Sequence, residues 1–232
     1  MAEKYAIILA GGSGTRAGGA LPKQFRTICG RPMLWWSLKA FFNADPDTHL
    51  IVAMHPGFIR DWEAMEASLP EESRVRHQLV NGGQSRADSV ANALNSIPSG
   101  CNGLVAVHDA ARPLVSTELI NSGWDAVLSE NTGAIPAIDV SDSLRKITAD
   151  GSVSVIRKDY VAVQTPQVFD LASLRKAYSS IDPLDPVFTD DASVFEKCGG
   201  KIVIYKGSTD NIKVTNPQDF EIAELLLGKK RS

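Results

Sequence analysis

Cysteine is scarce in this sequence of 232 residues, and its few copies stand far apart. Cys29, Cys101 and Cys198 are odd in number and form no Cys-x-x-Cys pair. This spacing excludes a disulfide framework and disfavours a zinc site, and it is typical of a protein that works in a reducing compartment. We therefore expect a cytoplasmic protein.

Long hydrophobic runs and a strong net charge are also missing. No stretch approaches the ~20 apolar residues that a membrane-spanning helix needs. The apolar run 5–10 is too short for the core of a signal peptide, and glycines and Arg16 follow it directly. A formal net charge of −3 gives no electrostatic basis for binding nucleic acid. We expect neither a membrane nor a nucleic acid as a partner.

Strand-like and helix-like segments alternate through the first two-thirds of the chain. Runs rich in Val and Ile predict strands, and segments with helical spacing lie between them. The predicted strands are Tyr5–Ala10, His49–Met54, Val75–Val80, Gly103–His108 and Thr132–Ile138, and the predicted helices are Met33–Asn43, Phe58–Ser68, Ser85–Ile97 and Ser116–Ser129. The pattern predicts an α/β fold with a Rossmann-like, mostly parallel twisted sheet flanked by helices. No linker divides the chain, so we expect residues 1–232 to form a single domain.

One segment interrupts this alternation, at about residues 139–163. Asp150-Gly151 stands there between two short runs of alternating β-forming residues, which is a strong signal for a β-hairpin. A hairpin inserted into an α/β order has no obvious core to cover. We expect a β-arm that either packs on its own domain or reaches toward a second subunit.

A glycine-rich turn follows the first predicted strand and is the most informative local feature. Gly11, Gly12 and Gly14 allow backbone N–H groups to approach an anion closely, and Arg16 and Lys23 follow with positive charge. This combination suits a polyphosphate and indicates nucleotide chemistry.

Three nucleotide-binding interpretations compete for this turn. A P-loop would need a Gly-Lys-Ser/Thr sequence that is not present. Gly12, Gly14 and Ala17 match the dinucleotide fingerprint, but the second predicted strand ends at His55 without the carboxylate that would hold a ribose. A nucleotidyltransferase, in which the loop surrounds a nucleoside triphosphate, agrees best with the two cations.

Two further segments suit that interpretation. Asp109 directly follows the predicted strand 103–108, at the carboxyl edge of the sheet where ligands bind, so it is either a Mg²⁺ ligand or a helix cap. In the second glycine turn, Gly82 and Gly83 precede Arg86 and Ser89, which could face a base. A structural alternative stays open there, in which Ser85 caps a helix.

Several motifs together resemble one family, the 2-C-methyl-D-erythritol 4-phosphate cytidylyltransferases of the non-mevalonate isoprenoid pathway. The matching stretches occur in family order over almost the whole chain. They are Ala10-Gly-Gly-Ser-Gly-Thr-Arg16, Pro22-Lys23-Gln24, Gly82-Gly83 with Arg86-Ala87-Asp88-Ser89, His108-Asp-Ala-Ala-Arg-Pro113, Thr165-Pro-Gln167, Thr189-Asp190 and Asp210-Asn-Ile-Lys-Val-Thr215. The resemblance implies transfer of CMP from CTP to 2-C-methyl-D-erythritol 4-phosphate, with release of pyrophosphate.

The resemblance also implies roles for individual residues, a Mg²⁺ ion and a homodimer joined through the β-arm. The implied catalytic residues are Arg16, Lys23 and Lys213, and the implied metal ligand is Asp109. The implied nucleotide-binding residues are Ala10, Gly11, Gly12, Gly14, Gly82, Gly83, Arg86 and Ser89, and the implied substrate-binding residues are Arg112, Ser143, Arg157, Thr165 and Thr189. Ser143 departs from the family, which usually has threonine there.

The chemistry of this reaction needs no general base. The second pKa of a phosphate monoester lies near 6, so the attacking phosphate is mostly ionised at pH 7. His108, beside Asp109, is accordingly expected to pack in the core. Two alternatives remain at this point: a cytidylyltransferase for ribitol 5-phosphate or glycerol phosphate, and a non-catalytic nucleotide-binding module.

Overall fold

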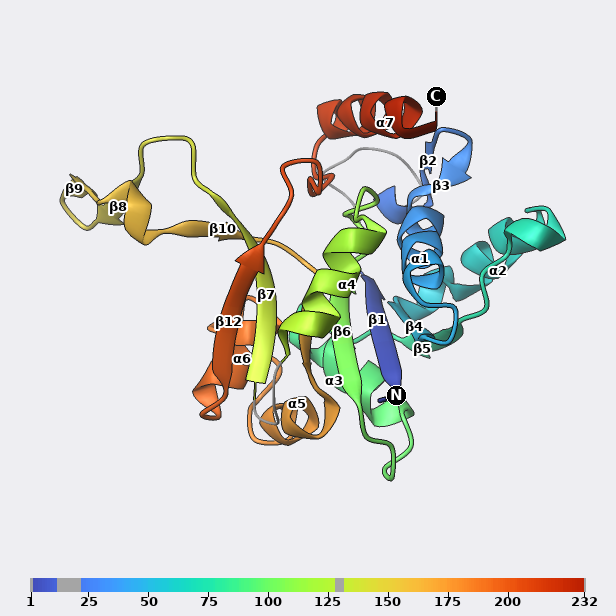
Figure 1. The fold of residues 1–232 in the computed structure, drawn as a ribbon, viewed down its shortest axis with the longest axis horizontal. Coiled ribbons are helices and arrows are strands. Elements are labelled where there is room, and N and C mark those ends of the chain that lie inside the picture. The colour runs from blue at the N-terminus through green and yellow to red at the C-terminus, as the bar shows by residue number, and fades with distance from the viewer. Residues whose placement is uncertain (1, 12–21, 128–131, 232) are drawn as a thin grey trace.

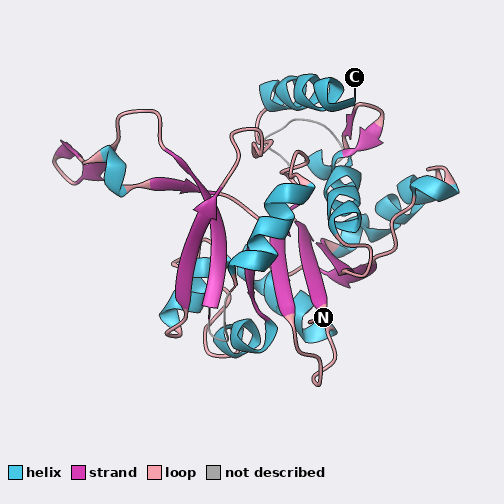
Figure 2. Cartoon of the chain, in the orientation of Figure 1, coloured by secondary structure: helices cyan, strands magenta, loops and turns pink. Residues whose placement is uncertain are grey.

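The computed structural model describes residues 2–11, 22–127 and 132–231, and its fold is drawn in Figures 1 and 2. A mixed sheet forms the centre, and helices lie on both of its faces (Figure 2). The strand order is β10-β7-β11-β6-β1-β4-β5. β10 and β11 pair with the same edge of β7, and β12 pairs with its opposite edge. The predicted α/β fold class is confirmed.

Four parallel strands carry the predicted βα units. β1 (Lys4–Ala10) pairs with β4 (His49–Met54) and with β6 (Leu104–Asp109), and β5 (Gln78–Asn81) extends the sheet beyond β4. Alternate β1 residues face opposite sides, so Ala6 and Ile8 are buried in one core cluster and Ile7 in the other. Because the carboxyl ends of these strands meet at one edge, the loops that follow them are brought together.

The other half of the sheet is antiparallel in part, which the sequence pattern did not predict. β11 (Gln167–Asp170) runs antiparallel between β6 and β7 (Thr132–Asp139), and β10 (Val161–Val163) runs antiparallel to β7 as well. β12 (Lys201–Lys206) is parallel to β7. The strands β10 and β11 are short, and they form through pairing with neighbouring strands, β10 with β7 and β11 with both β6 and β7.

Helices cover the two faces as amphipathic segments. α1 (Met33–Ala44), α2 (Ile59–Ala67) and α4 (Thr117–Ala126) pack on one face, and α3 (Arg86–Ser96), α5 (Leu171–Tyr178) and α6 (Asp191–Lys197) on the other. α7 (Pro217–Arg231) lies against the small hairpin of β2 (Thr27–Ile28) and β3 (Arg31–Pro32). Short 3₁₀ turns are η2 (Lys23–Phe25), η3 (Pro56–Phe58), η4 (Glu71–Ser73) and η5 (Arg157–Asp159).

The predicted β-hairpin is present and projects from the sheet (Figure 1). β8 (Arg145–Thr148) pairs antiparallel with β9 (Gly151–Ser154), and Gly151 has a positive φ of 135° at the turn. The side chains of Ile147 and Ile156 are 79% and 62% exposed. The hairpin therefore has little apolar contact with the rest of its own chain.

None of the helices in the described ranges is both long and apolar enough to cross a membrane. The expected cytoplasmic location stays a prediction from the sequence.

Gly103, the residue just before β6, offers a test of how the strand that carries Asp109 is anchored. Its φ is +133°, and an added Cβ would lie 2.1 Å from the Glu3 carbonyl oxygen, which accepts the Leu104 N–H. Gly103→Ala should therefore lower the free energy of unfolding by about 2 kcal/mol or more in urea titrations. Gly100→Ala is the control, because an added Cβ meets nothing within 4 Å. Equal stability of the two variants would contradict this account.

Candidate active site

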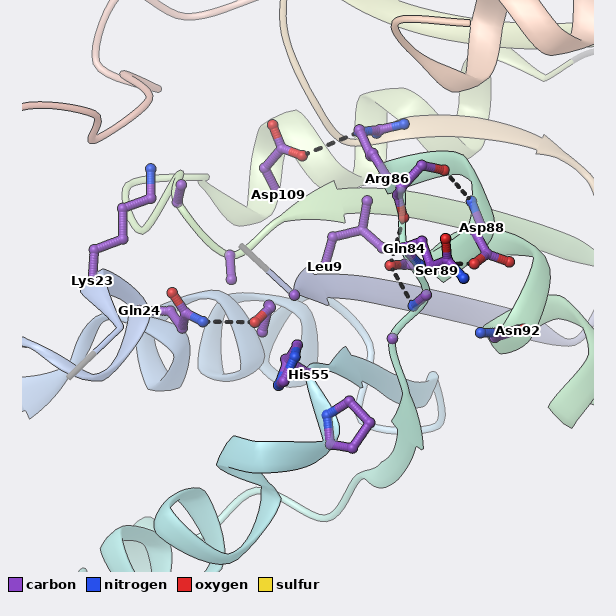
Figure 3. Close-up of a pocket in the computed structure, with 18 of the residues that line it drawn as sticks. Leu9, Lys23, Gln24, His55, Gln84, Arg86, Asp88, Ser89, Asn92 and Asp109 are labelled. Atoms are coloured by element: carbon purple, nitrogen blue, oxygen red, sulfur yellow. Dashed lines mark hydrogen bonds and ion pairs between the residues drawn. The ribbon is translucent and has the colours of Figure 1, made fainter. Parts of the chain in front are cut away.

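A cleft of about 1010 Å³ opens where the parallel strands end (Figure 3). Gly11 follows β1, His55 follows β4, Gly82 follows β5, and Asp109 is the last residue of β6. Binding at the carboxyl edge of parallel strands is the rule for open α/β sheets. The volume is sufficient for a nucleotide together with a second small substrate.

Most of the described residues expected at the nucleotide and metal sites meet in this cleft. Its walls include Ala10, Gly11, Lys23, Gly82, Gly83, Arg86, Ser89, Asp109 and Lys213. These residues come from five separate parts of the sequence, which the fold brings together. Gly12, Gly14 and Arg16 lie outside the described residues, so their predicted roles stay predictions.

Asp109 stands between two cations. Lys213 Nζ lies 2.7 Å from Asp109 Oδ2, and Arg86 Nε lies 3.6 Å from Oδ1 (the Arg86 contact is drawn in Figure 3). Burial alone would raise the pKa of Asp109, but the charges of Arg86 and Lys213 outweigh it and hold the pKa well below its usual range. The carboxylate is therefore ionised at neutral pH.

The second glycine turn contains the helix cap that the sequence left open, whereas its contact with a base stays a prediction. Ser85 caps α3, since its Oγ accepts the Asp88 N–H at 2.9 Å. The Gly83 N–H donates to Ser89 Oγ at 3.0 Å, which ties the turn to the cleft-lining face of the helix. An added Cβ on Gly83 would lie 2.2 Å from the Asp88 carboxylate, so glycine allows this close approach.

The turn η2 holds two walls of the cleft in place. Lys23 Nζ donates to the Val214 carbonyl at 2.8 Å, in the loop that carries Lys213. Gln24 Nε2 donates to the Ala10 carbonyl at 2.6 Å, at the end of β1. Lys23 therefore lines the cleft as a charge and also fixes the loop opposite.

Two predicted substrate-binding residues, Thr165 and Arg112, do not line the cleft but form hydrogen bonds with the segments that carry its residues. Thr165 is 5% exposed, and its Oγ1 accepts the Asp109 N–H at 3.1 Å. Arg112 Nη1 donates to the Asn211 carbonyl at 2.8 Å, and the Asn211 amide donates to the Thr165 carbonyl. These bonds join the end of β6 to the loop that carries Lys213.

The remaining predicted substrate-binding residues lie outside the cleft walls. Ser143 and Arg157 are exposed on the arm, where Arg157 Nη1 donates to the Ser141 carbonyl. Thr189 is exposed in the loop just before α6. Their roles stay predictions that depend on how the arm and this loop meet a second substrate.

The sequence did not reveal one functional candidate, a buried carboxylate that contacts Arg86. Asp191, the first residue of α6, is fully buried and accepts hydrogen bonds from Arg86 Nη2 and Tyr178 OH, each at 2.7 Å. Gln167 Oε1 accepts the Asp191 N–H at 3.1 Å. The available sequence signal was Asp190-Asp191 before a helical segment, which ordinarily indicates only a helix cap.

His108 is a core residue, as expected. It is fully buried, its Nδ1 lies 3.1 Å from Thr165 Oγ1, and its ring lies 5.5 Å from that of Phe41. Burial is the main cause that lowers the pKa of His108, to about 4. The imidazole is therefore neutral at physiological pH and is not placed to act in the cleft.

The donor set suits a metal that arrives with phosphates. Within the described ranges, no three His, Cys, Asp or Glu side chains are grouped closely enough to hold an ion by themselves. Mg²⁺ commonly takes one or two carboxylates and completes its shell with water and substrate phosphates. One ionised carboxylate in a cleft lined by lysines, Asp109, fits this requirement.

Together, a glycine-lined cleft at the carboxyl edge of an α/β sheet and an ionised aspartate among cations define an enzyme of the nucleotidyltransferase class. The family model described as "IspD: 2-C-methyl-D-erythritol 4-phosphate cytidylyltransferase" matches residues 5–229. The chain belongs to this family, and the predicted cytidylyltransferase activity, which forms 4-diphosphocytidyl-2-C-methyl-D-erythritol, is confirmed at the family level.

Individual members of this family are similar to the chain over nearly their full length. A 2-C-methyl-D-erythritol 4-phosphate cytidylyltransferase of Porphyromonas gingivalis is 42% identical, over 97% of this chain and 98% of the relative. One from Phocaeicola vulgatus is 39% identical, over 97% of this chain and 100% of the relative. The crystal structure of the Thermus thermophilus cytidylyltransferase has a TM-score of 0.74 at 31% identity and covers 97% of this chain and 98% of its own.

The buried His108 predicts a specific pH dependence of stability. In the unfolded chain a histidine binds a proton near pH 6.5, but His108 in the folded chain does so only near pH 4. Below pH 6.5 the unfolded state therefore gains protons that the folded state lacks, and stability falls by about 1.4 kcal/mol per pH unit from this group. His108→Gln should make unfolding in urea less dependent on pH between 6.5 and 5. An unchanged dependence would show that His108 is not buried as a neutral ring.

Proposed function

We propose that this chain transfers CMP from CTP to 2-C-methyl-D-erythritol 4-phosphate in the cleft at the carboxyl edge of the sheet. The observation that carries the proposal is the ionised Asp109 held between Arg86 and Lys213, beside a glycine turn suited to a nucleotide. Because both substrates are polyanions, the main task of the site is to align them and to neutralise their charge.

The nucleotide would lie along the wall made by the two glycine turns. Gly82, Gly83 and Ser89 would contact the base, since all three line the cleft. Lys23 and Lys213 line it as well and would bind the phosphates. Arg16 is assigned to the phosphates by the family resemblance alone.

The acceptor phosphate would attack the α-phosphorus of CTP in line, and pyrophosphate would leave. A phosphate monoester is mostly ionised at pH 7, so the attack needs no proton acceptor. This agrees with a buried, neutral His108. Lysine ammonium groups would hold the charge that develops on the transferred phosphoryl oxygens and on the leaving pyrophosphate.

A Mg²⁺ ion would be held by Asp109 together with the phosphates of CTP. When bound, the ion would supply Lewis-acid stabilisation of phosphate charge. Lys213 Nζ lies 2.7 Å from Asp109 Oδ2, so the lysine would exchange this contact for a phosphate oxygen when CTP and the ion bind.

The arm would bring Ser143 and Arg157 to the acceptor site of a second subunit. Its apolar side chains Ile147, Val153 and Ile156 are at least half exposed in the single chain, which supports a homodimer as the state in which they become covered. Ser143 retains the hydroxyl of the threonine usual in the family, and it would still donate to the acceptor.

The proposed reaction is tested by measuring pyrophosphate release with CTP and Mg²⁺ and one of three acceptors. Methylerythritol phosphate should support turnover, whereas ribitol 5-phosphate and glycerol 3-phosphate should not. Turnover with ribitol 5-phosphate or glycerol 3-phosphate would support the same transfer reaction but show that the acceptor has been assigned wrongly. No release with any of the three would favour a module that binds nucleotide without catalysis.

The arm assignment makes a separate prediction. Arg157→Ala should raise KM for methylerythritol phosphate about tenfold or more and leave KM for CTP unchanged, because a charge-assisted contact to one substrate is lost. Lys158→Ala, at the adjacent exposed position, is the matched control and should change neither constant. Equal losses for both substrates in Arg157→Ala would contradict the assignment.

A further inference from the structure

Asp191 is a buried acid that the mechanism above does not use. It lies at the start of α6, 0% exposed, and both of its carboxylate oxygens are engaged. Oδ2 accepts from Arg86 Nη2 and Oδ1 accepts from Tyr178 OH, each at 2.7 Å. A buried carboxylate is costly unless charged and polar partners compensate it, so this arrangement needs a reason.

Arg86 is the connection between this acid and the cleft. One guanidinium is shared by two carboxylates, since Nη2 lies 2.7 Å from Asp191 Oδ2 and Nε lies 3.6 Å from Asp109 Oδ1. Burial would lower the pKa of Arg86, but Asp191 and Asp109 raise it above its ordinary value. The short contact is to Asp191, so Asp191 is the stronger anchor of the two.

The backbone around Asp191 is held rigidly. Gln167 Oε1, on β11, accepts the N–H groups of Asp191 and Ala192 at 3.1 and 3.0 Å. Gln167 Nε2 also donates to Asp190 Oδ2 at 2.8 Å. The backbone that carries the Asp191 carboxylate is thereby tied to β11, an interior strand of the sheet.

We propose that Asp191 is a positioning residue for the nucleotide site: it holds Arg86 in the cleft wall and keeps that cation from closing on Asp109. The inference rests on the proposed function, in which Arg86 belongs to the cleft wall that binds the nucleotide and Asp109 lies beside the phosphates of CTP.

The charge balance explains why the anchor matters. Asp191 forms the short ion pair with Arg86, and among the described residues the short ion pair of Asp109 is the one with Lys213. Without the charge of Asp191, Asp109 would be the only carboxylate that Arg86 contacts within the described chain. Arg86 would then move toward Asp109. This movement would displace a residue of the cleft wall that binds the nucleotide, and Arg86 would compete with Mg²⁺ and the phosphates of CTP for the Asp109 carboxylate. Arg86 would then have to be repositioned when CTP binds, and the free energy that this costs would weaken the binding of CTP.

The main experiment compares Asp191→Asn with Asp170→Asn. Asparagine is close in size to aspartate, but it removes the charge and replaces one acceptor oxygen with an NH₂ donor. Asp170 is the matched control, because it caps α5 through the Ser173 N–H and forms no ion pair among the described residues. The readouts are the dissociation constant of CTP by titration calorimetry in EDTA, KM for both substrates at saturating Mg²⁺, and unfolding in urea.

We expect Asp191→Asn to weaken CTP binding in EDTA about tenfold or more, as fits the loss of a charge-assisted hydrogen bond that orders a ligand-binding group. KM for the acceptor should stay unchanged, and so should CTP binding by Asp170→Asn. Asp191→Glu retains the charge and should restore most of the affinity. Unchanged CTP binding by Asp191→Asn, or equal losses for both substrates, would overturn the proposal.

A double-mutant cycle with Arg86→Ala separates action through Arg86 from a general effect on the core. In the Arg86→Ala background, Asp191→Asn should change CTP affinity by less than about twofold, because the group through which it acts is gone. A further loss as large as in the wild-type background would show that Asp191 acts by another route. If Arg86→Ala alone leaves CTP binding intact, the assignment of Arg86 to the nucleotide site fails, and this inference fails with it.

Folding is controlled with a second, smaller variant. Asp191→Ser also removes the charge and is measured beside Asp191→Asn. If either variant folds, its CTP affinity decides the question. If both fail to fold while Asp170→Asn folds, the carboxylate is a requirement of the core, and the positioning role is contradicted.

Discussion

The ion pairs of Asp109 are the interaction on which the rest of the site depends. Asp109 ends a central strand, Arg86 begins a helix on one face, and Lys213 lies in a loop near the end of the chain. Their charges join three parts of the chain at the carboxyl edge of the sheet. Because the carboxylate is only 12% exposed as a side chain, removing either cation would leave it poorly compensated.

This constraint also explains how an acidic protein can bind two polyanions. The net charge of the chain is −3, yet Lys23, Arg86 and Lys213 line one cleft. Clefts focus the field of the charges that line them, so the local potential can differ in sign from the whole molecule. The cations are held by carbonyls and carboxylates of the protein, which prepares their positions before a nucleotide arrives.

Sequence alone predicted the parts of the fold whose signals are local. His49–Met54 was predicted with the bounds that the structure has, and Met33, the first residue of α1, was predicted as well. The Asp150-Gly151 hairpin was also predicted, since its turn chemistry is contained in two residues. Val75–Val80 was too long, because β5 begins only at Gln78, where pairing with β4 begins. β10 and β11 were missed, since their short runs become strands only through long-range pairing, with β7 for β10 and with β6 and β7 for β11.

The same distinction applies to the site. Glycine turns and Asp109 could be found because parallel strands must end at one edge, so the residues that follow them are neighbours. Thr165 and Arg112 could not be placed, since their contacts with the Asp109 backbone and with Asn211 depend on long-range packing. Asp191 could not be found for the same reason: it lies 105 residues from the arginine that it binds. Buried polar networks leave no periodic signal in a sequence.

The most direct test of the central claim is a crystal structure with CTP and Mn²⁺ in place of Mg²⁺, in which anomalous scattering locates the metal. The account predicts a metal peak at the Asp109 carboxylate, with the triphosphate between it and Lys23 and with Lys213 moved from Asp109 to a phosphate oxygen. A metal peak away from Asp109, or a triphosphate bound outside this cleft while the Lys213 contact persists, would contradict it.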